Sequence, residues 1–210
     1  MSSADAAAPG PGPGAGAQSI DERAVASTSS SVLGMVLFVA SESMFFAAFF
    51  GAYVTSYVNN KIWPPNNTPA PGTTMPTIAV VALALSALLL QLAIRAGHRG
   101  EPSAVNRWLA LSMATAIITV ILLVAGYSDV GFGLKAGIFA SLFYLMTGLG
   151  LAHVAGGVVL LGLVAWQGIS GRLALVRYQP LQAAQVYWNF VLVLGLVIYV
   201  VFYVLTNTGG

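Results

Sequence analysis

The chain has 210 residues, of which 58% are hydrophobic and only 7% are charged. A soluble domain carries about 25% charged residues, so this chain cannot solvate a whole surface and is predicted to be a membrane protein. The net charge of +2 is too small to indicate nucleic acid as a partner, and the absence of cysteine excludes disulfides, thiolate metal sites and a cysteine nucleophile.

The first thirty residues differ in composition from the rest. Residues Ala7–Ala17 read AAPGPGPGAGA, a low-complexity run that cannot pack a hydrophobic core. The segment lacks the basic start and the apolar stretch of a signal peptide. We therefore predict that residues 1–30 form a disordered cytoplasmic tail and that residues 31–208 form the folded domain.

Five apolar segments follow the tail. Each is long enough to cross a bilayer, which requires about 20 apolar residues. Proline and glycine residues interrupt the chain between them. The predicted fold class is all-α, a polytopic membrane helix bundle with five transmembrane helices. The predicted spans are 31–58, 76–96, 106–126, 134–168 and 182–206.

The basic residues predict the orientation of this bundle. Six of the eight basic residues fall on one side of the membrane if the spans are right. Arginine and lysine are enriched in cytoplasmic loops, so that side and the N-terminus are predicted to be cytoplasmic. The C-terminus then faces the periplasm or the outer surface. The six residues are Arg23, Arg95, Arg99, Arg107, Arg172 and Arg177.

Glu42 is the one charged residue between Leu33 and Tyr57, in the first predicted span. A charge at the bilayer centre costs about 2.5 kcal/mol or more, so it is rare without a partner or a function. Two interpretations are open: a structural, hydrogen-bonded and protonated carboxyl, or a carboxyl that takes part in proton supply. Helical spacing places it on one stripe with the aromatic residues Phe45, Phe46, Phe49 and Tyr53.

His153 is the one histidine inside a predicted span. Gly148, Ala152 and Gly156 form a row of small residues on the same helix, and such rows let two helix backbones approach closely. We therefore expect His153 to face another helix rather than lipid. It is either a hydrogen-bonded core histidine or the partner of Glu42.

The chain holds too few ligands for a redox centre of its own. Haem and copper centres need several histidines or thiolates, whereas this chain has two histidines and no cysteine. It also has no phosphate-binding loop and no paired catalytic carboxylates. We therefore expect no catalytic residue, no metal site and no cofactor bound by this chain itself.

Several short motifs follow one another along the membrane part of the chain. They are SExxFF at Ser41–Phe46, WPP at 63–65, FYLMTG at Phe143–Gly148, HVxGG at 153–157 and YWNF at 187–190. This ordered set resembles subunit III of haem–copper terminal oxidases, the cytochrome c oxidase subunit 3 family, in its short five-helix bacterial form. The resemblance covers roughly residues 31–206.

The chain departs from the pattern of that family at three positions. Gly150 and Asn189 stand where relatives usually carry histidine, and Leu192 stands where they carry aspartate. These losses and the membrane carboxyl of Glu42 leave two alternatives open. One is a subunit III-like accessory protein of a nitric oxide reductase or another respiratory complex, and the other is a free-standing proton-coupled membrane carrier.

The resemblance implies a non-catalytic subunit in a bacterial cell membrane. Its partners would be the catalytic subunit I, which would hold haem and copper, other oxidase subunits, and structural phospholipid. It implies support of aerobic electron transport, of proton uptake and of the stability of the catalytic subunit. Glu42 corresponds to the family's carbodiimide-reactive carboxyl, with His153 as its possible hydrogen-bond partner. Candidates for contact with lipid head groups are Trp63, Arg95, Arg99 and Arg172.

Overall fold

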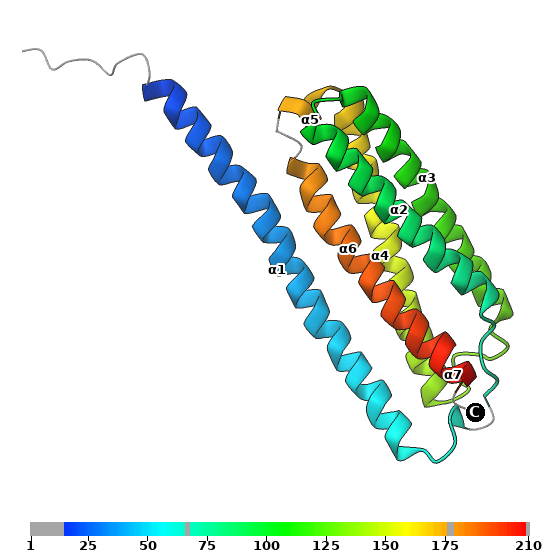
Figure 1. The fold of residues 1–210 in the computed structure, drawn as a ribbon. Helices are drawn as coiled ribbons and strands as arrows, with labels where there is room; N and C mark the ends of the chain where they lie inside the picture. The colour runs from blue at the N-terminus through cyan, green and yellow to red at the C-terminus, as the bar shows by residue number, and fades with distance from the viewer. Residues whose placement is uncertain (1–14, 66–67, 176–178, 209–210) are drawn as a thin grey trace, which may run out of the picture.

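The computed structural model describes residues 15–65, 68–175 and 179–208, which form a bundle of helices (Figure 1). The long helices are α1 (Ala15–Asn59), α2 (Thr74–His98), α3 (Pro102–Gly126), α4 (Ile138–Ile169) and α6 (Gln179–Tyr199). The short elements are η2 (Tyr127–Asp129), α5 (Arg172–Leu175), the π-helix η3 (Val200–Val204) and α7 (Leu205–Thr208).

Five helices in the described part of the chain are long and apolar enough to cross a membrane. This result confirms the prediction of an all-α bundle with five candidate spans. The spans are Ser31–Asn59, Thr74–His98, Pro102–Asp129, Ile138–Ile169 and Gln179–Asn207.

The predicted tail over residues 1–30 stays a prediction. Its residues 1–14 lie outside the described residues, and α1 begins at Ala15, ahead of the candidate span that begins at Ser31. The alternating proline and glycine residues end at Gly14, and proline is the residue that interrupts a helix most strongly. The helix therefore extends further toward the N-terminus than the hydrophobic pattern indicates.

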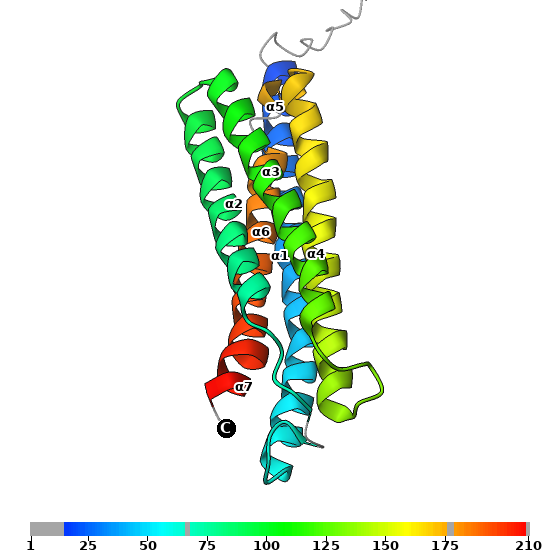
Figure 2. The same ribbon diagram turned by 90° about the vertical axis from the view of Figure 1, so that its right-hand side faces the viewer.

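Helices α2 and α3 lie side by side along their lengths in both views (Figures 1 and 2). Small residues on the facing sides, such as Ala79 and Ala116, are fully buried. Ser86 Oγ donates to the Ser112 carbonyl at 2.8 Å, and Ser112 Oγ donates to the Ser86 carbonyl at 2.9 Å. The hydrophobic effect does not drive helices together inside a lipid bilayer. Membrane helices therefore associate through close packing of small side chains and through hydrogen bonds such as these.

Trp188 joins α6 to both α2 and α4. Its side chain is 1% exposed, and its indole N–H donates to Ser86 Oγ at 3.2 Å. The ring lies against Gly157 of α4, where a Cβ atom would overlap it. Gly157 is therefore the residue that allows the α4 backbone to approach the tryptophan.

Helix α1 forms the outer layer of the bundle. It contacts α6 and α4, while α2 and α3 lie on the far side of those two helices (Figures 1 and 2). In the most apolar stretch of its span only 6% of the residues are buried, compared with 39% in the corresponding stretch of α2. The contacts between α1 and the bundle are therefore few, and each has a large share in fixing its position.

We predict that Gly157→Ala destabilises the bundle, because the added methyl group must displace the Trp188 ring. Overpacking of this kind costs about 1–3 kcal/mol. Gly162→Ala is the matched control on the same helix, since nothing lies within 4 Å of the position of its Cβ atom. Thermal unfolding of the purified protein in detergent measures both variants. Equal midpoints for the two variants would contradict this account of the contact.

Candidate functional site

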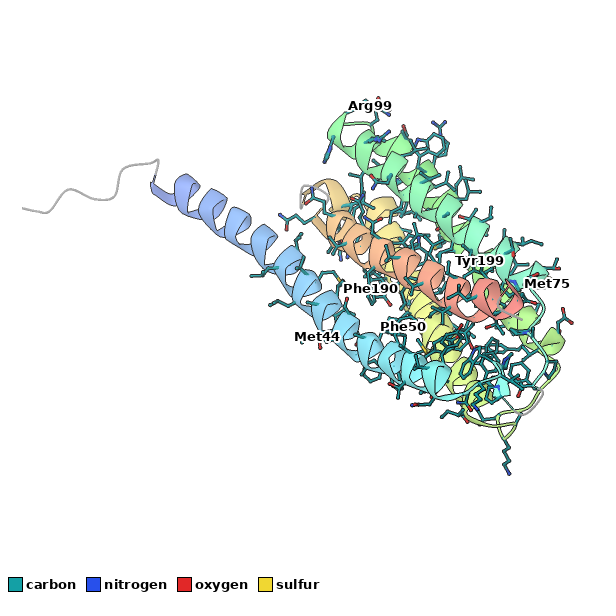
Figure 3. All side chains as sticks on the ribbon, turned by 60° about the horizontal axis from the view of Figure 1, so that its bottom comes forward. Met44, Phe50, Met75, Arg99, Phe190 and Tyr199 are labelled. Carbon is teal, nitrogen blue, oxygen red and sulfur yellow. The ribbon has the colours of Figure 1, made fainter. Side chains whose placement is uncertain are left out.

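The packed face of α1 carries Glu42. Phe46 and Tyr53, one and three helical turns further along, are 2% and 5% exposed. Phe45, which the sequence places on the same stripe, is 47% exposed and lies at its edge. Its ring lies 5.9 Å from that of Phe46 and 4.8 Å from that of Phe49, so Phe45 is a neighbour of these rings and the most exposed aromatic member of the stripe. Met44, at 78% exposure, lies on the opposite side of α1 from Phe190 (Figure 3).

Glu42 and His153 lie next to each other in the structure. Oε2 of Glu42 is 3.3 Å from Nε2 of His153, which belongs to α4. The side chains are 25% and 13% exposed, respectively. The pair therefore connects the outer helix α1 to the bundle, and both of its side chains are mostly buried.

The second ring nitrogen of His153 determines how the pair can share protons. Nδ1 lies 2.8 Å from the carbonyl oxygen of Leu149 in the same helix. A carbonyl oxygen only accepts, so Nδ1 carries a hydrogen and donates it. Nε2 then either accepts from a protonated Glu42 or, in an imidazolium, donates to its carboxylate. Both arrangements have zero net charge and differ only in the position of one proton.

Aromatic side chains surround this pair. The ring of His153 lies 5.3 Å from that of Phe46, 6.1 Å from that of Phe190 and 6.5 Å from that of Tyr187, measured between centroids. The hydroxyl of Tyr187 donates to the backbone carbonyl of His153 at 2.9 Å. The histidine is therefore held by α1, α4 and α6 together, and its ring has little freedom to turn away from Glu42.

The tightest contacts of α4 with α6 fall on Gly157 and on Gly150, whose Cβ atom would lie 3.1 Å from Cδ1 of Ile198. Ala152 and Gly156 belong to the row of small residues and are exposed, although a Cβ atom at Gly156 would lie 3.4 Å from the hydroxyl of Tyr187 in α6. The row therefore borders the contact with α6 and does not form its centre. His153 nevertheless faces α1 and α6.

The four candidates for lipid head groups lie at two ends of the bundle. Arg95, Arg99 and Arg172 are exposed at the end where α2 and α4 terminate, as Arg99 shows in Figure 3. Arg99 pairs with Glu101 at 3.1 Å, and the guanidinium of Arg172 lies 5.9 Å from the centroid of the Trp166 ring. Trp63 lies in the loop after α1, and its indole N–H already donates to the hydroxyl of Tyr53 at 3.1 Å.

The described residues contain no group of three or more His, Asp or Glu side chains that could hold a metal ion. Glu42 and His153 supply two such side chains, and the groups around them are aromatic rings and a tyrosine hydroxyl. The chemistry open to this pair is therefore hydrogen bonding and transfer of a proton.

Tyr187 is the contributor to this site that the sequence analysis did not single out. It was noted only as part of the YWNF motif. A signal for it is present in the sequence. Two adjacent large residues, Tyr187 and Trp188, lie on one helix, and two adjacent glycines that could accommodate them, Gly156 and Gly157, lie on another. The hydroxyl of Tyr187 lies 3.4 Å from the position of a Cβ atom at Gly156.

Comparison with known proteins gives a consistent result. A family described as cytochrome c oxidase subunit III matches residues 17–207. A cytochrome c oxidase subunit 3 of Thermostichus vulcanus is 29% identical over 177 residues, which cover 84% of this chain and 88% of that protein. Proteins of the same name are 29% identical in a Synechocystis species (83% and 75% covered) and 28% identical in Corynebacterium diphtheriae (81% and 86% covered).

We predict that Glu42→Leu weakens the attachment of α1, because it leaves Nε2 of His153 without a partner. A hydrogen bond between membrane helices contributes about 1 kcal/mol. Ser43→Ala is the matched control, since the hydroxyl of Ser43 is exposed and donates only to the Val39 carbonyl of its own helix. Thermal unfolding in detergent should show a lower midpoint for Glu42→Leu alone. Equal midpoints for the two variants would exclude a stabilising contact.

Proposed function

The chain belongs to the cytochrome c oxidase subunit III family, and we propose that it supports proton uptake by the catalytic subunit through the Glu42–His153 pair. As a member of this family it is a subunit of a terminal oxidase and a multi-pass membrane protein. Association with other oxidase subunits follows from that membership. The sequence left two alternatives open, an accessory protein of a nitric oxide reductase or another respiratory complex and a free-standing carrier. The family match favours the oxidase subunit over both.

The geometry of the pair carries the proposal. Nδ1 of His153 is committed to the Leu149 carbonyl, so the only mobile proton of the pair lies between Nε2 and Oε2 of Glu42. The Glu42 side chain keeps a quarter of its surface exposed on the outer layer of the bundle. A carboxyl in this position can exchange its proton with a neighbouring subunit or the membrane surface while the helices stay in contact.

The partner in this proposal is the catalytic subunit I, which would hold the haems and copper, together with the remaining oxidase subunits.

The exposed arginines near the ends of α2 and α4 suit a second role, which is contact with lipid head groups. Arg95 and Arg172 carry positive charge at one end of the bundle, where anionic phospholipid head groups would meet them. The same arginines favour a cytoplasmic position for that end.

The variant Glu42→Gln separates the structural role from the proton role. A glutamine amide donates a hydrogen bond to Nε2 as the protonated acid does, but it does not release its proton. We expect the assembled complex to be retained and its turnover to fall as pH rises, because protons become scarce and the exchangeable site is lost. Oxygen consumption between neutral and alkaline pH measures this, with Ser43→Ala as the control.

One result would contradict the proposal, and a second would assign the loss of turnover to a different cause. Unchanged turnover across the pH range in an intact Glu42→Gln complex would leave only the structural role. A uniform loss at every pH, with subunits missing from the purified complex, would mean that the glutamine has disturbed assembly rather than proton supply.

Purification through a tag on this chain tests the partner and the lipid together. We expect haem and copper to copurify, and we expect Arg95→Gln with Arg172→Gln to lower the anionic phospholipid bound per haem. Lys61→Gln with Lys135→Gln is the matched control, because these two charges lie at the opposite end of the bundle. A haem-free isolate would contradict the partner, and equal lipid in both double variants would contradict the head-group site.

A further inference from the structure

Three amide side chains lie inside the candidate membrane spans where α6 runs beside α2 (Figure 1). Gln91 belongs to α2, and Gln185 and Asn189 belong to α6. The middle residues of the two spans are Ser86 and Val193, so these amides lie five, eight and four residues from the middle. At a rise of 1.5 Å per residue the offsets are about 8, 12 and 6 Å. All three therefore lie within the hydrocarbon layer, which extends about 15 Å on either side of the bilayer centre.

The hydrogen bond between α6 and α2 shows which way Asn189 points. Trp188 donates to Ser86 Oγ and is therefore turned toward α2. A helix turns by about 100° per residue, so Asn189 lies roughly a quarter of a turn away from Trp188, and its side chain is exposed. Val193 and Leu196, further along the same side of α6, are 59% and 42% exposed. This side of α6 is thus left uncovered by the described part of the chain.

The two glutamines border the same side of the bundle, and both are partly buried. Gln91 lies one turn from Leu88, which is 63% exposed on the outer side of α2. Helices α2 and α6 run in opposite directions, and Ser86 meets Trp188. Gln91 follows Ser86 and Gln185 precedes Trp188, so the two glutamines lie at nearly the same level. We call this surface the amide face, and its members are Gln91, Gln185 and Asn189.

The amide face has no partner within the part of the chain that the structure describes. No hydrogen bond joins any of its three side chains to another described residue. Asn60 and Asn207, at the ends of helices, differ: each donates to the carbonyl four residues earlier, at 2.7 and 2.8 Å. The same bond at Asn189 would still leave its amide oxygen unpaired, because the N–H groups of a helix interior are already bonded. An unpaired amide is unfavourable in hydrocarbon, so a partner from outside this chain is expected.

Lipid does not supply what Asn189 needs. Acyl chains have neither hydrogen-bond donors nor acceptors. The edge of the hydrocarbon layer is about 9 Å from this residue, and its side chain lacks the length with which lysine and arginine reach the head groups. A helix of another membrane protein can supply both a donor and an acceptor at this depth, since Ser, Thr, Asn and Gln form hydrogen bonds between membrane helices.

We propose that the amide face binds a transmembrane helix of another oxidase subunit. That helix would carry a side chain that both donates and accepts at the level of Asn189, an amide or a hydroxyl. The exposed Leu88, Val193 and Leu196 would pack around this hydrogen bond and separate it from lipid. The proposal rests on the association with other oxidase subunits, and it is independent of the proton role of Glu42.

Photocrosslinking in the assembled complex, isolated through a tag on this chain, tests the surface. The photoreactive amino acid p-benzoylphenylalanine replaces Val193 on the amide-bearing side of α6. We expect a crosslink to a membrane-spanning peptide of another subunit, identified by mass spectrometry. The same amino acid in place of Ile121, which is 60% exposed on α3, is the control and should not crosslink to that peptide. A crosslink to a second copy of this chain, or to lipid without protein, overturns the proposal.

The variant Asn189→Leu tests the amide itself, because it replaces a polar side chain by an apolar one of similar volume. We expect the crosslinked subunit retained after a detergent wash to fall about three- to tenfold, since one hydrogen bond between membrane helices is lost. Val193→Leu is the matched control on the same side of α6 and should retain that subunit. Equal retention in the two variants overturns the role of Asn189.

The two proposals fail in different ways. An isolate without haem would contradict the oxidase partner of the proposed function. A haem-containing complex that gives no protein crosslink from position 193 would contradict the amide face alone, and the pH dependence of Glu42→Gln would be unaffected by that result.

Discussion

The absence of water in the hydrocarbon layer is the constraint on which this structure depends. Polar groups there must find partners within the protein, because an unpaired group costs several kcal/mol. The polar side chains of the bundle meet this demand by linking helices. Ser86 and Ser112 join α2 to α3, Trp188 joins α6 to Ser86, and Glu42 joins α1 to α4. Polar residues thus specify which helices are neighbours, while the apolar surface specifies only that they lie in the membrane.

The helices around Trp188 and the outer helix α1 are held in the bundle by different kinds of contact. Around Trp188 the backbones approach closely, because Gly157 leaves room for the indole ring and small residues line the α2–α3 contact. Helix α1 has little such packing, and its contacts are the Glu42–His153 pair and a group of aromatic rings. Tyr53 adds a link near the end of α1, where its hydroxyl donates to the Val201 carbonyl at 3.2 Å. That carbonyl belongs to the π-helix η3, and it also accepts from Thr206 Oγ1 at 3.3 Å.

Much of this could be predicted from the sequence, and the limits have physical causes. Hydropathy gives the five spans because length and apolarity alone decide them. Glu42 and His153 stand out because charge and imidazole are rare in hydrocarbon, but no pattern within one helix gives their distance. Which aromatic residue faces inward depends on the rotation of α1 against its neighbours, so Phe45 and Phe46 could not be told apart. The rotation of α4 has the same effect, so the sequence does not show that Gly150 and Gly157 make the tightest contacts with α6.

In the proposed function one pair both holds a helix and exchanges a proton, and these two tasks involve different atoms. His153 is anchored through Nδ1 and through its own backbone carbonyl, which accepts from Tyr187. Neither bond involves Nε2, so moving the proton between Nε2 and Oε2 leaves the histidine in place. The pair stays neutral while the proton moves between these two atoms, but release of that proton to a neighbouring group leaves one negative charge on the pair. The proposed role therefore requires that each release is followed by uptake of another proton at the same site.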